Sequence, residues 1–414
     1  MLGKIDIKSR FRHRMLATII ALMGTVLTSI ANDAVYFVNG SLLTPVQETD
    51  ISIKKEILTI SIGDDGIANV EVDYTFVNNG PAKLVTMGFE AMSPYNDGAT
   101  PSFKGGHPYI MNFSVVMNGE SLNYNNGIVF GGEDVEQLPQ EAQDAYKKGQ
   151  YLVPIDFNRW HYDEENSERM YNKQTDEYAS FAYAYYFNAN FKSGENTVRH
   201  TYRYKMSCGV SKAFSFDYWL LPAMRWANHQ IDDFTLRINA DNCTKHFVID
   251  CAPFEGTPFN VTKGKGKTRT LNVEGFGEHY NVLEVVLRNG TLEWHRNNYR
   301  TEHNMSIESA EFLNYAMEWG NKPAPLYYDS GPNFAWWNTF DDYYPGKGTQ
   351  KQLREFNARL RRNLPYAHRG YVFKDATLKK IFESQWWYMP DPSWQPTGNS
   401  FSAHEQELMK EPLE

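Results

Sequence analysis

The residues best suited to chemistry lie near the C-terminus, in a Tyr-Ala-His-Arg-Gly stretch and a Trp-Trp-Tyr cluster that follows it. An arginine can hold a carboxylate through two parallel hydrogen bonds, and an imidazole can exchange a proton near neutral pH. Tryptophan and tyrosine rings can stack on sugar rings or on a peptide. The candidate binding residues are therefore Tyr366, His368, Arg369, Trp386, Trp387 and Tyr388.

A second candidate site lies in "RWHYD" and the acidic residues that follow it. His161 stands two residues before Asp163, which could orient the ring for proton transfer. Further carboxylates follow at Glu164, Glu165 and Glu168. They lack the ordered spacing of a calcium-binding loop, so a solvated acidic loop is the favoured interpretation. Acid–base chemistry at these residues is the basis of an alternative function, a hydrolase acting on envelope glycans or peptides.

Other stretches that suggest catalysis lack the required partners. His200 falls on an aromatic strand face with no nucleophile or carboxylate motif beside it, which favours a core histidine. The basic run "TKGKGKTR" has Val261 where a phosphate-binding loop needs a glycine, so it is predicted to be a glycine-rich turn with solvated charges. The motifs of serine hydrolases, zinc proteases and dinucleotide-binding enzymes do not occur. We therefore predict no catalytic residue, no metal site and no cofactor.

The N-terminus has the pattern of a signal peptide. Four positive residues precede an uncharged apolar run over residues 15–30, and small residues end it. We predict cleavage after Ala31 and export to the periplasm or the extracellular space. An uncleaved membrane anchor is the alternative, although the run is short for spanning a bilayer and no second one follows. The positive residues are Lys8, Arg10, Arg12 and Arg14.

Charge excludes one class of partner. The formal net charge is -9, and removal of residues 1–31, which contain five Lys/Arg and one Asp, would change it to -13. A field of this sign repels phosphate backbones, so nucleic acid is not an expected partner.

The cysteines allow one disulfide in an oxidising compartment. Cys243 and Cys251 are the closest pair in the sequence, and Cys208 would remain as a thiol. A bridge between the two requires the chain to turn, because a straight strand would hold them too far apart.

Alternating apolar and polar residues over 51–288 predict short strands joined by Gly, Asn and Pro turns. Residues 181–191 and 196–206 are predicted to pair as a long antiparallel hairpin with one aromatic face. The predicted fold class is mainly β, with antiparallel β-sandwich packing over residues 32–300 in two units that share this stretch. Residues 133–178 interrupt it as a helical and acidic insertion, predicted to be a helix and a loop.

The C-terminal part changes character. Residues 301–345 are predicted to form a helix and an aromatic connector rich in Pro and Gly. Apolar residues then recur at helical spacing, which predicts a small α-helical module over residues 346–396. The polar residues 397–414 are predicted to be a disordered tail.

A module of this size needs most of its aromatic residues in its core. Trp387 and Tyr388 are therefore expected inside rather than on a binding platform. Trp386 is also expected to pack inside, but adjacent side chains cannot share one direction, so a surface position for it, together with Arg369, stays open. These two residues form the sharpest candidate for ligand binding.

The stretch "RRNLPYAHRGYVFKDATLKKIFESQWWY" resembles the YARHG domain, a small module of bacterial cell-envelope and secreted proteins. The arginine and histidine of the name motif are exchanged here, as His368-Arg369, which argues against a fixed catalytic pair because the two side chains differ in reach and pKa. Residues in register with the family pattern are Arg362, Asn363, Tyr366, Ala367, Gly370, Tyr371, Phe373, Leu378, Phe382, Trp387 and Tyr388.

The β-rich part is similar to a bacterial envelope domain family of unknown function built from β-sandwiches. The similarity rests on the hydrophobic pattern and on Glu56, Phe76, Tyr202, Tyr218 and Trp226. Both resemblances imply a location in the cell envelope and a fold, but they do not imply a reaction.

We therefore predict a secreted or periplasmic non-enzymatic protein with no transmembrane span after signal cleavage. Its C-terminal YARHG-like module is expected to bind a cell-wall glycan or an envelope protein. The envelope hydrolase remains the alternative, and the oligomeric state is left open.

Overall fold

The structure is a computed structural model that describes residues 39–41, 44–45, 49–92, 106–131, 135–163, 169–209, 211–275, 278–317, 319, 322–334 and 340–410. These residues belong to one compact unit, Ala34–Glu414. The predicted signal peptide, residues 1–31, lies outside the described residues, so cleavage after Ala31 stays a prediction. Within the described ranges, no helix has the length and apolar character needed to cross a membrane.

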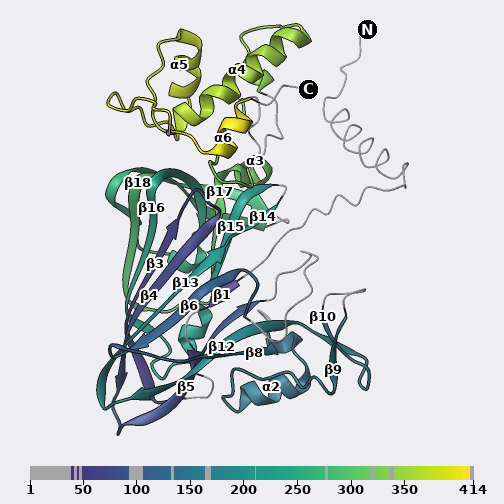
Figure 1. Ribbon diagram of the computed structural model, residues 1–414, viewed down its shortest axis with the longest axis vertical. Coiled ribbons are helices and arrows are strands. Elements are labelled where there is room, and N and C mark those ends of the chain that lie inside the picture. Colours follow the sequence, from purple (N-terminus) through teal and green to yellow (C-terminus); the bar gives the residue numbers. More distant parts are fainter. Residues whose placement is uncertain are drawn as a thin grey trace, which may run out of the picture. The chain divides into compact units, whose positions relative to one another are not determined.

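Most of the described strands belong to one large sheet of sixteen strands (Figure 1). Neighbouring strands are antiparallel, except that β3 pairs parallel with β16 and β1 pairs parallel with β15. This confirms the predicted mainly β, antiparallel class. The strands of this sheet are β1 (Asn39–Ser41), β2 (Thr44–Pro45), β3 (Ile51–Ile62), β4 (Ile67–Asn78), β5 (Lys83–Met92), β6 (Ile110–Met117), β7 (Glu120–Ser121), β8 (Asn125–Phe130), β12 (Phe181–Phe191), β13 (Gly194–Lys205), β14 (Ser207–Gly209), β15 (Lys212–Trp219), β16 (Ile231–Asp250), β17 (Asn260–Gly275), β18 (Glu278–Tyr299) and β19 (Met305–Ser309).

A second, three-stranded sheet and several short helices complete the fold. The small sheet has the order β11-β10-β9. The C-terminal helices coincide with the predicted YARHG-like module, which confirms its α-helical character. The elements are β9 (Trp160–Asp163), β10 (Arg169–Asn172), β11 (Glu177–Ala179), α2 (Gln140–Lys147), α3 (Leu313–Ala316), α4 (Gln350–His368), α5 (Ala376–Glu383) and α6 (Ala403–Leu408), with the 3-10 turns η1 (Val135–Gln137), η2 (Leu221–Arg225), η3 (Ala252–Phe254), η4 (Ala310–Phe312) and η5 (Asp341–Tyr343).

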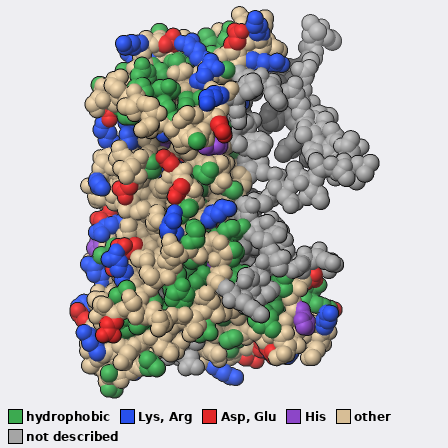
Figure 2. All heavy atoms as spheres, in the orientation of Figure 1, with side chains coloured by type: hydrophobic (Ala, Val, Ile, Leu, Met, Phe, Trp, Pro, Cys, Tyr) green, Lys and Arg blue, Asp and Glu red, His purple; other side chains and the backbone are tan. Residues whose placement is uncertain are grey.

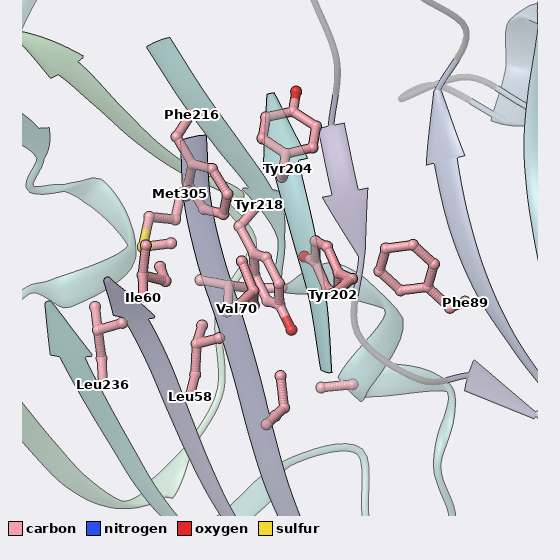
Figure 3. Packing of buried hydrophobic residues seen from close by; sticks show 14 of the residues in the cluster. Leu58, Ile60, Val70, Phe89, Tyr202, Tyr204, Phe216, Tyr218, Leu236 and Met305 are labelled. Carbon is pink, nitrogen blue, oxygen red and sulfur yellow. The ribbon is translucent and has the colours of Figure 1, made fainter. Parts of the chain in front are cut away.

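The large sheet folds over so that distant strands face each other across one core. The ring of Phe89 on β5 lies 5.5 Å from that of Phe113 on β6 and 4.8 Å from that of Tyr202 on β13, measured between centroids. Because β5 is far from β6 and β13 in the strand order, only a folded sheet brings them together. Figure 3 shows Phe89 and Tyr202 inside this core beside Tyr218 of β15. The division of residues 32–300 into two sandwich-like units stays a prediction.

The aromatic strands β12 and β13 follow one another but do not pair. β12 pairs with β5 and β8, whereas β13 pairs with β4 and β6. The predicted long hairpin between them is therefore wrong, because the chain crosses between facing parts of the sheet at this corner. Two asparagine side chains hold the corner, since Asn78 and Asn196 both donate to the carbonyl of Lys192, at 3.3 and 2.9 Å.

The insertion over residues 133–178 contains the predicted helix, α2, but the described residues after it are not a continuous loop. The chain after α2 forms the small sheet β9–β11 instead. Trp160, Met170 and Ala179 lie on its inner face and are at most 2% exposed. These alternate apolar residues give the segment a core of its own, which a solvated loop would lack.

His200 lies in the main core, as expected, and is 0% exposed. Its ring lies 5.8 Å from that of Tyr74 and 6.0 Å from that of Tyr202. Neither ring nitrogen has a hydrogen-bond partner among the described residues. Burial lowers the pKa of His200 to about 3, so the ring is neutral and a weak base.

Replacing Glu56 by glutamine should remove a pH dependence of stability. Glu56 is 0% exposed, and burial raises its pKa well above 4.5. The folded state therefore keeps a proton that the unfolded chain loses, so this stabilisation is full below about pH 4.5 and is lost as the pH rises toward the folded pKa. The loss is about 1.4 kcal/mol for each pH unit in that window. Urea unfolding from pH 5 to 8 should show the wild type weakening relative to Glu56→Gln.

The exposed Glu120 on β7 offers a matched control. Glu120→Gln should keep the pH dependence of the wild type. Parallel stability curves for the wild type and Glu56→Gln would contradict the assignment of a protonated Glu56 to the core.

Candidate functional site

The module that carries the candidate residues is built from three capped helices. Thr349 and Gln352 form a reciprocal capping box at the start of α4, and Asp375 accepts from the backbone of Leu378 at the start of α5. Helix α4 continues through Pro365 to His368.

The segment expected to be a disordered tail, residues 397–414, contains helix α6 instead. Ser402 and Glu405 form its capping box, and Glu405 and Leu408 are buried. The expectation failed because burial of these two side chains against the module offsets the polar character of their neighbours. The pattern Ser-x-x-Glu was a sequence signal for this helix.

Two rings of the Trp-Trp-Tyr cluster lie in the core of the module, and the third lies where the module contacts the large sheet. Trp387 is 2% exposed and Tyr388 is 6% exposed, and both pack with Phe373 and Phe382 of the module. Trp386 is half-buried. The two buried rings contribute to the stability of the module, which is the role that its small size requires of most aromatic residues.

Arg369 does not project freely from the module. Its guanidinium donates to both carboxylate oxygens of Glu405, at 2.8 Å each, and its side chain is 18% exposed. Tyr328 also donates its hydroxyl to Glu405, which is 0% exposed. Although burial opposes the charged form, the bonds to Glu405 raise the pKa of Arg369. The residue expected to hold a ligand carboxylate thus holds one from its own chain.

His368 is buried under the same cluster and is 2% exposed. Its ring lies 5.0 Å from that of Tyr328 and 5.8 Å from that of Trp387. Burial lowers the pKa of His368 well below 6.5, and nearby cations such as Arg369 lower it further. His368 is therefore a neutral part of the packing.

The glycine that ends the Tyr-Ala-His-Arg-Gly stretch is required by its surroundings. Gly370 has a φ of +88°, a left-handed conformation that disfavours side chains. A Cβ atom there would lie 2.4 Å from the Nη1 atom of Arg288 and 2.6 Å from the carbonyl oxygen of Met389. The close approach lets Arg288 on β18 donate to the carbonyls of His368 and Met389, at 3.3 and 2.7 Å.

A basic face of β17 forms the rest of this contact. We define the docking strip as Lys265, Lys267 and Arg269, which alternate along β17 and so project from one face of the strand. The ammonium of Lys267 donates to the carbonyls of Trp386 and Tyr388, both at 3.0 Å. These residues were expected to be solvated charges in a turn, and the structure places them in a strand that binds the module.

The two ends of the docking strip contact different groups of the module. Lys265 forms an ion pair with Asp391 at 2.9 Å. The guanidinium of Arg269 lies 4.4 Å from the ring of Trp386 and also pairs with Glu284 on β18. Trp386 thus uses one ring face against the chain itself. The signal that could have revealed the strip is the spacing of its basic residues by two, which matches a strand face.

A buried histidine–carboxylate pair lies next to the docking strip. The Nε2 atom of His246 lies 2.8 Å from Glu284, and both residues are 1% exposed. An imidazole oriented by a carboxylate can act as a base. Here the ring packs against Tyr327 and Trp386, at 5.1 and 6.3 Å, so no substrate can reach it. The pair is suited to holding the junction together.

The connector before the module carries a second buried charge cluster. Lys245 of β16 is 1% exposed and lies 3.1 Å from Asp329 and 3.1 Å from Asp64. Burial opposes the charge of Lys245, but the two carboxylates together raise its pKa. Asp329 directly follows Tyr328, whose hydroxyl bonds Glu405. Adjacent connector residues therefore bind the β sheet and the module.

The second candidate site is only partly described. His161 is exposed on β9, and Asp163 on the same strand face accepts from the hydroxyl of Tyr178 at 3.1 Å. Across the described ranges, no group of three or more His, Cys, Asp or Glu residues is arranged to hold a metal ion. Glu164, Glu165 and Glu168 lie outside the described residues.

The disulfide considered for Cys243 and Cys251 is not formed. Both thiols are free, and so is that of Cys208. The strand β16 continues from Cys243 to Asp250, so the chain does not make the turn that a bridge would need.

A half-buried aromatic cluster remains on the outside of the module. We define the outer aromatic cluster as Tyr366, Tyr371, Trp394 and Phe401, each of intermediate exposure. The ring of Tyr366 lies 4.6 Å from Phe401 and 6.4 Å from Trp394, and Tyr371 lies 6.3 Å from Trp394. Figure 2 shows hydrophobic side chains bordered by Lys and Arg at the end of the molecule that carries α4 and α5.

The rings of the outer aromatic cluster do not form a flat surface. The interplanar angles are 57° between Tyr366 and Phe401, 82° between Tyr366 and Trp394, and 83° between Tyr371 and Trp394. Rings set edge-on leave a notched surface, which suits an inserted apolar side chain better than a flat sugar ring.

Comparison with known proteins identifies the module but not its ligand. The family model described as "YARHG domain" matches residues 338–412. No curated protein matches the chain.

Two solved structures are among those to which the chain is similar. The chain is similar to a "putative nutrient binding protein" from Legionella pneumophila, with 16% identity over 91% of this chain and 97% of that one and a TM-score of 0.48. It is also similar to an M1 zinc metallopeptidase from Deinococcus radiodurans, with 8% identity over 64% of this chain and a TM-score of 0.22. The match spans only 43% of the metallopeptidase. Residues 338–412, which contain the three capped helices and the exchanged His-Arg pair, are a YARHG domain.

Proposed function

We propose that this chain is an exported, non-enzymatic protein of the bacterial cell envelope that binds an envelope protein through its YARHG domain. The observation that carries the proposal is the outer aromatic cluster, four half-buried rings on the outside of the module. Tyrosine and tryptophan are the residues that most often dominate protein–protein binding energy. The export itself rests on the N-terminal sequence, with cleavage after Ala31.

Only some of the binding residues predicted from the sequence remain candidates for direct contact with the partner. Tyr366 belongs to the outer aromatic cluster and is the candidate that we retain as a direct contact. His368, Arg369 and Trp386 act through the positions of the backbone and rings around them, since each is engaged within the chain. A cell-wall glycan is the other class of ligand considered for the module. It is less favoured, because rings set at steep angles do not offer the flat surface on which a sugar ring stacks.

Trp394→Ala combined with Phe401→Ala should weaken capture of the partner. Immobilised full-length protein would be incubated with envelope extract, and the captured protein identified and then titrated as a pure component. We expect the affinity for the partner to fall about tenfold or more. An aromatic side chain that is buried at the centre of a protein–protein interface contributes about 2 kcal/mol or more to the binding free energy.

Val372→Ala is the matched control, because Val372 is 41% exposed on the same module and is not part of the cluster. It should leave capture unchanged, and circular dichroism melting should verify that all variants fold. Full capture by the double variant, or capture of cell-wall oligosaccharide alone, would contradict the proposal.

A further inference from the structure

Three side chains from distant parts of the chain meet in the buried charge cluster around Lys245. The ammonium of Lys245 on β16 lies 3.2 and 3.1 Å from the two carboxylate oxygens of Asp329 in the connector. The carboxylate of Asp64, in the turn between β3 and β4, lies 3.1 Å from the same ammonium. Because the Nζ atom is almost equally far from both oxygens of Asp329, it faces the carboxyl carbon between them. Reacting atoms held at about 3 to 3.5 Å are in position for attack.

The surroundings of the lysine and its partner exclude water. Lys245 and Asp329 are each 1% exposed, and the centroid of the buried Phe214 ring lies 5.7 Å from the Nζ atom. The side chain of Asp64, in contrast, is 33% exposed. A dry site favours a reaction that releases water, because little water is present to reverse it. Asp64 lies on the side from which a released water can reach solvent.

The residues that follow Asp329 hold both carboxylates in place. The backbone N–H of Gly331 donates to the Oδ1 atom of Asp329 at 2.6 Å, and the hydroxyl of Ser330 donates to Asp64. A Cβ atom on Gly331 would lie 2.6 Å from the same Oδ1 atom, so this close approach requires glycine. The N–H group therefore points at an oxygen on which negative charge develops when an amine attacks the carboxyl carbon.

We propose that Lys245 and Asp329 join in an intramolecular isopeptide bond, an amide between the Nζ and Cγ atoms. The ammonium first passes one proton to the Oδ2 atom of Asp329, which leaves an amine beside a carboxylic acid. The electron pair of the nitrogen attacks Cγ, while Oδ1 carries the developing charge toward the N–H of Gly331. Asp64 takes a second proton from the nitrogen and gives it to Oδ2, which departs as water. One N–C bond forms, one C–O bond breaks, and the Asp64 carboxylate is restored.

The reactive state differs from the ion pair by the position of one proton. Burial favours the neutral amine and acid, whereas the two carboxylates raise the pKa of Lys245, so the ion pair predominates. A reaction that occurs once in each molecule needs only a minor population of the neutral pair. The bond closes a long loop between β16 and the connector, and it ties the YARHG domain covalently to the large sheet. The inference goes beyond the proposed function, since it concerns the attachment of the domain and involves no ligand.

Intact-mass spectrometry of the denatured full-length protein tests the bond. The wild type should be lighter by one water than the chain counted from its observed N-terminus. Trypsin should release a branched peptide that contains both Lys245 and Asp329. Lys245→Arg keeps the positive charge but lacks the amine, so it should have the full mass. Asp64→Asn removes the proton carrier, so a smaller fraction of its molecules should have lost water than of the wild type.

Lys263→Arg is the matched control, since Lys263 lies 3.6 Å from Asp241 but its side chain is 69% exposed. It should lose water as the wild type does. A wild type of full mass, a water loss that persists in Lys245→Arg, or a branched peptide that joins other residues would overturn the proposal. Stability alone does not distinguish the bond from the ion pair, because both link β16 to the connector. The wild-type mass needs neither a folded variant nor a ligand, so this proposal and the proposed function fail separately.

Discussion

Replacing Glu405 by alanine is expected to lower the free energy of unfolding by about 3 to 5 kcal/mol. The change leaves the guanidinium of Arg369 without its two bonds and the hydroxyl of Tyr328 without its acceptor. Both groups sit where water has little access, so solvent cannot replace the lost carboxylate. Urea unfolding followed by tryptophan fluorescence would measure the loss.

Glu407→Ala is the control, because Glu407 is exposed on the same helix, α6. It should change stability by less than about 0.5 kcal/mol. The double variant Arg369→Met with Glu405→Leu should recover most of the stability, since apolar residues of similar size often replace a buried ion pair without cost. A loss for Glu405→Ala no greater than that for Glu407→Ala would show that the contact does not stabilise the fold.

Lys245→Met is expected to cost a similar amount, about 3 to 5 kcal/mol. It leaves the carboxylate of Asp329, which is 1% exposed, with no cation beside it, and removes the charge that balances Asp64. The same urea experiment measures the effect. Combining it with Asp329→Asn should restore part of the stability, because the unpaired charge is then removed.

Lys263→Met is the matched control, since Lys263 pairs with Asp241 while its side chain is 69% exposed. Surface ion pairs contribute little, so the expected change is below about 1 kcal/mol. If Lys245→Met were as mild as Lys263→Met, the buried cluster would not link the connector to the sheet.

The strand content could be predicted from the sequence because alternation is a local property. In β4, for example, Val70, Val72, Tyr74 and Phe76 occupy one face and are all buried. Which strands pair is not local. β12 and β13 are joined by a short connection and were expected to pair, but facing parts of one folded sheet separate them.

In the candidate site, too, local features could be predicted from the sequence, whereas contacts between distant residues could not. The helical spacing and the small size of the module predicted a core role for Trp387 and Tyr388, and both are buried. The partner of Arg369 is Glu405, 36 residues later and in a segment whose polar composition predicted disorder. No spacing rule connects two such positions. The docking strip was detectable, because its basic residues alternate, but only once β17 was recognised as a strand.

Adjacent residues in the connector face two ways, Tyr328 toward Glu405 and Asp329 toward Lys245. Separating the sheet from the YARHG domain therefore breaks one of these buried contacts together with those of the docking strip, so we expect the two parts to unfold cooperatively. Asp329, which pairs with Lys245, and Met389, whose carbonyl accepts from Arg288, are both synthesised later than the residues they bind. The contacts of Tyr328 and Arg369 with Glu405 need α6, so we expect a protein shortened before α6 to lack them.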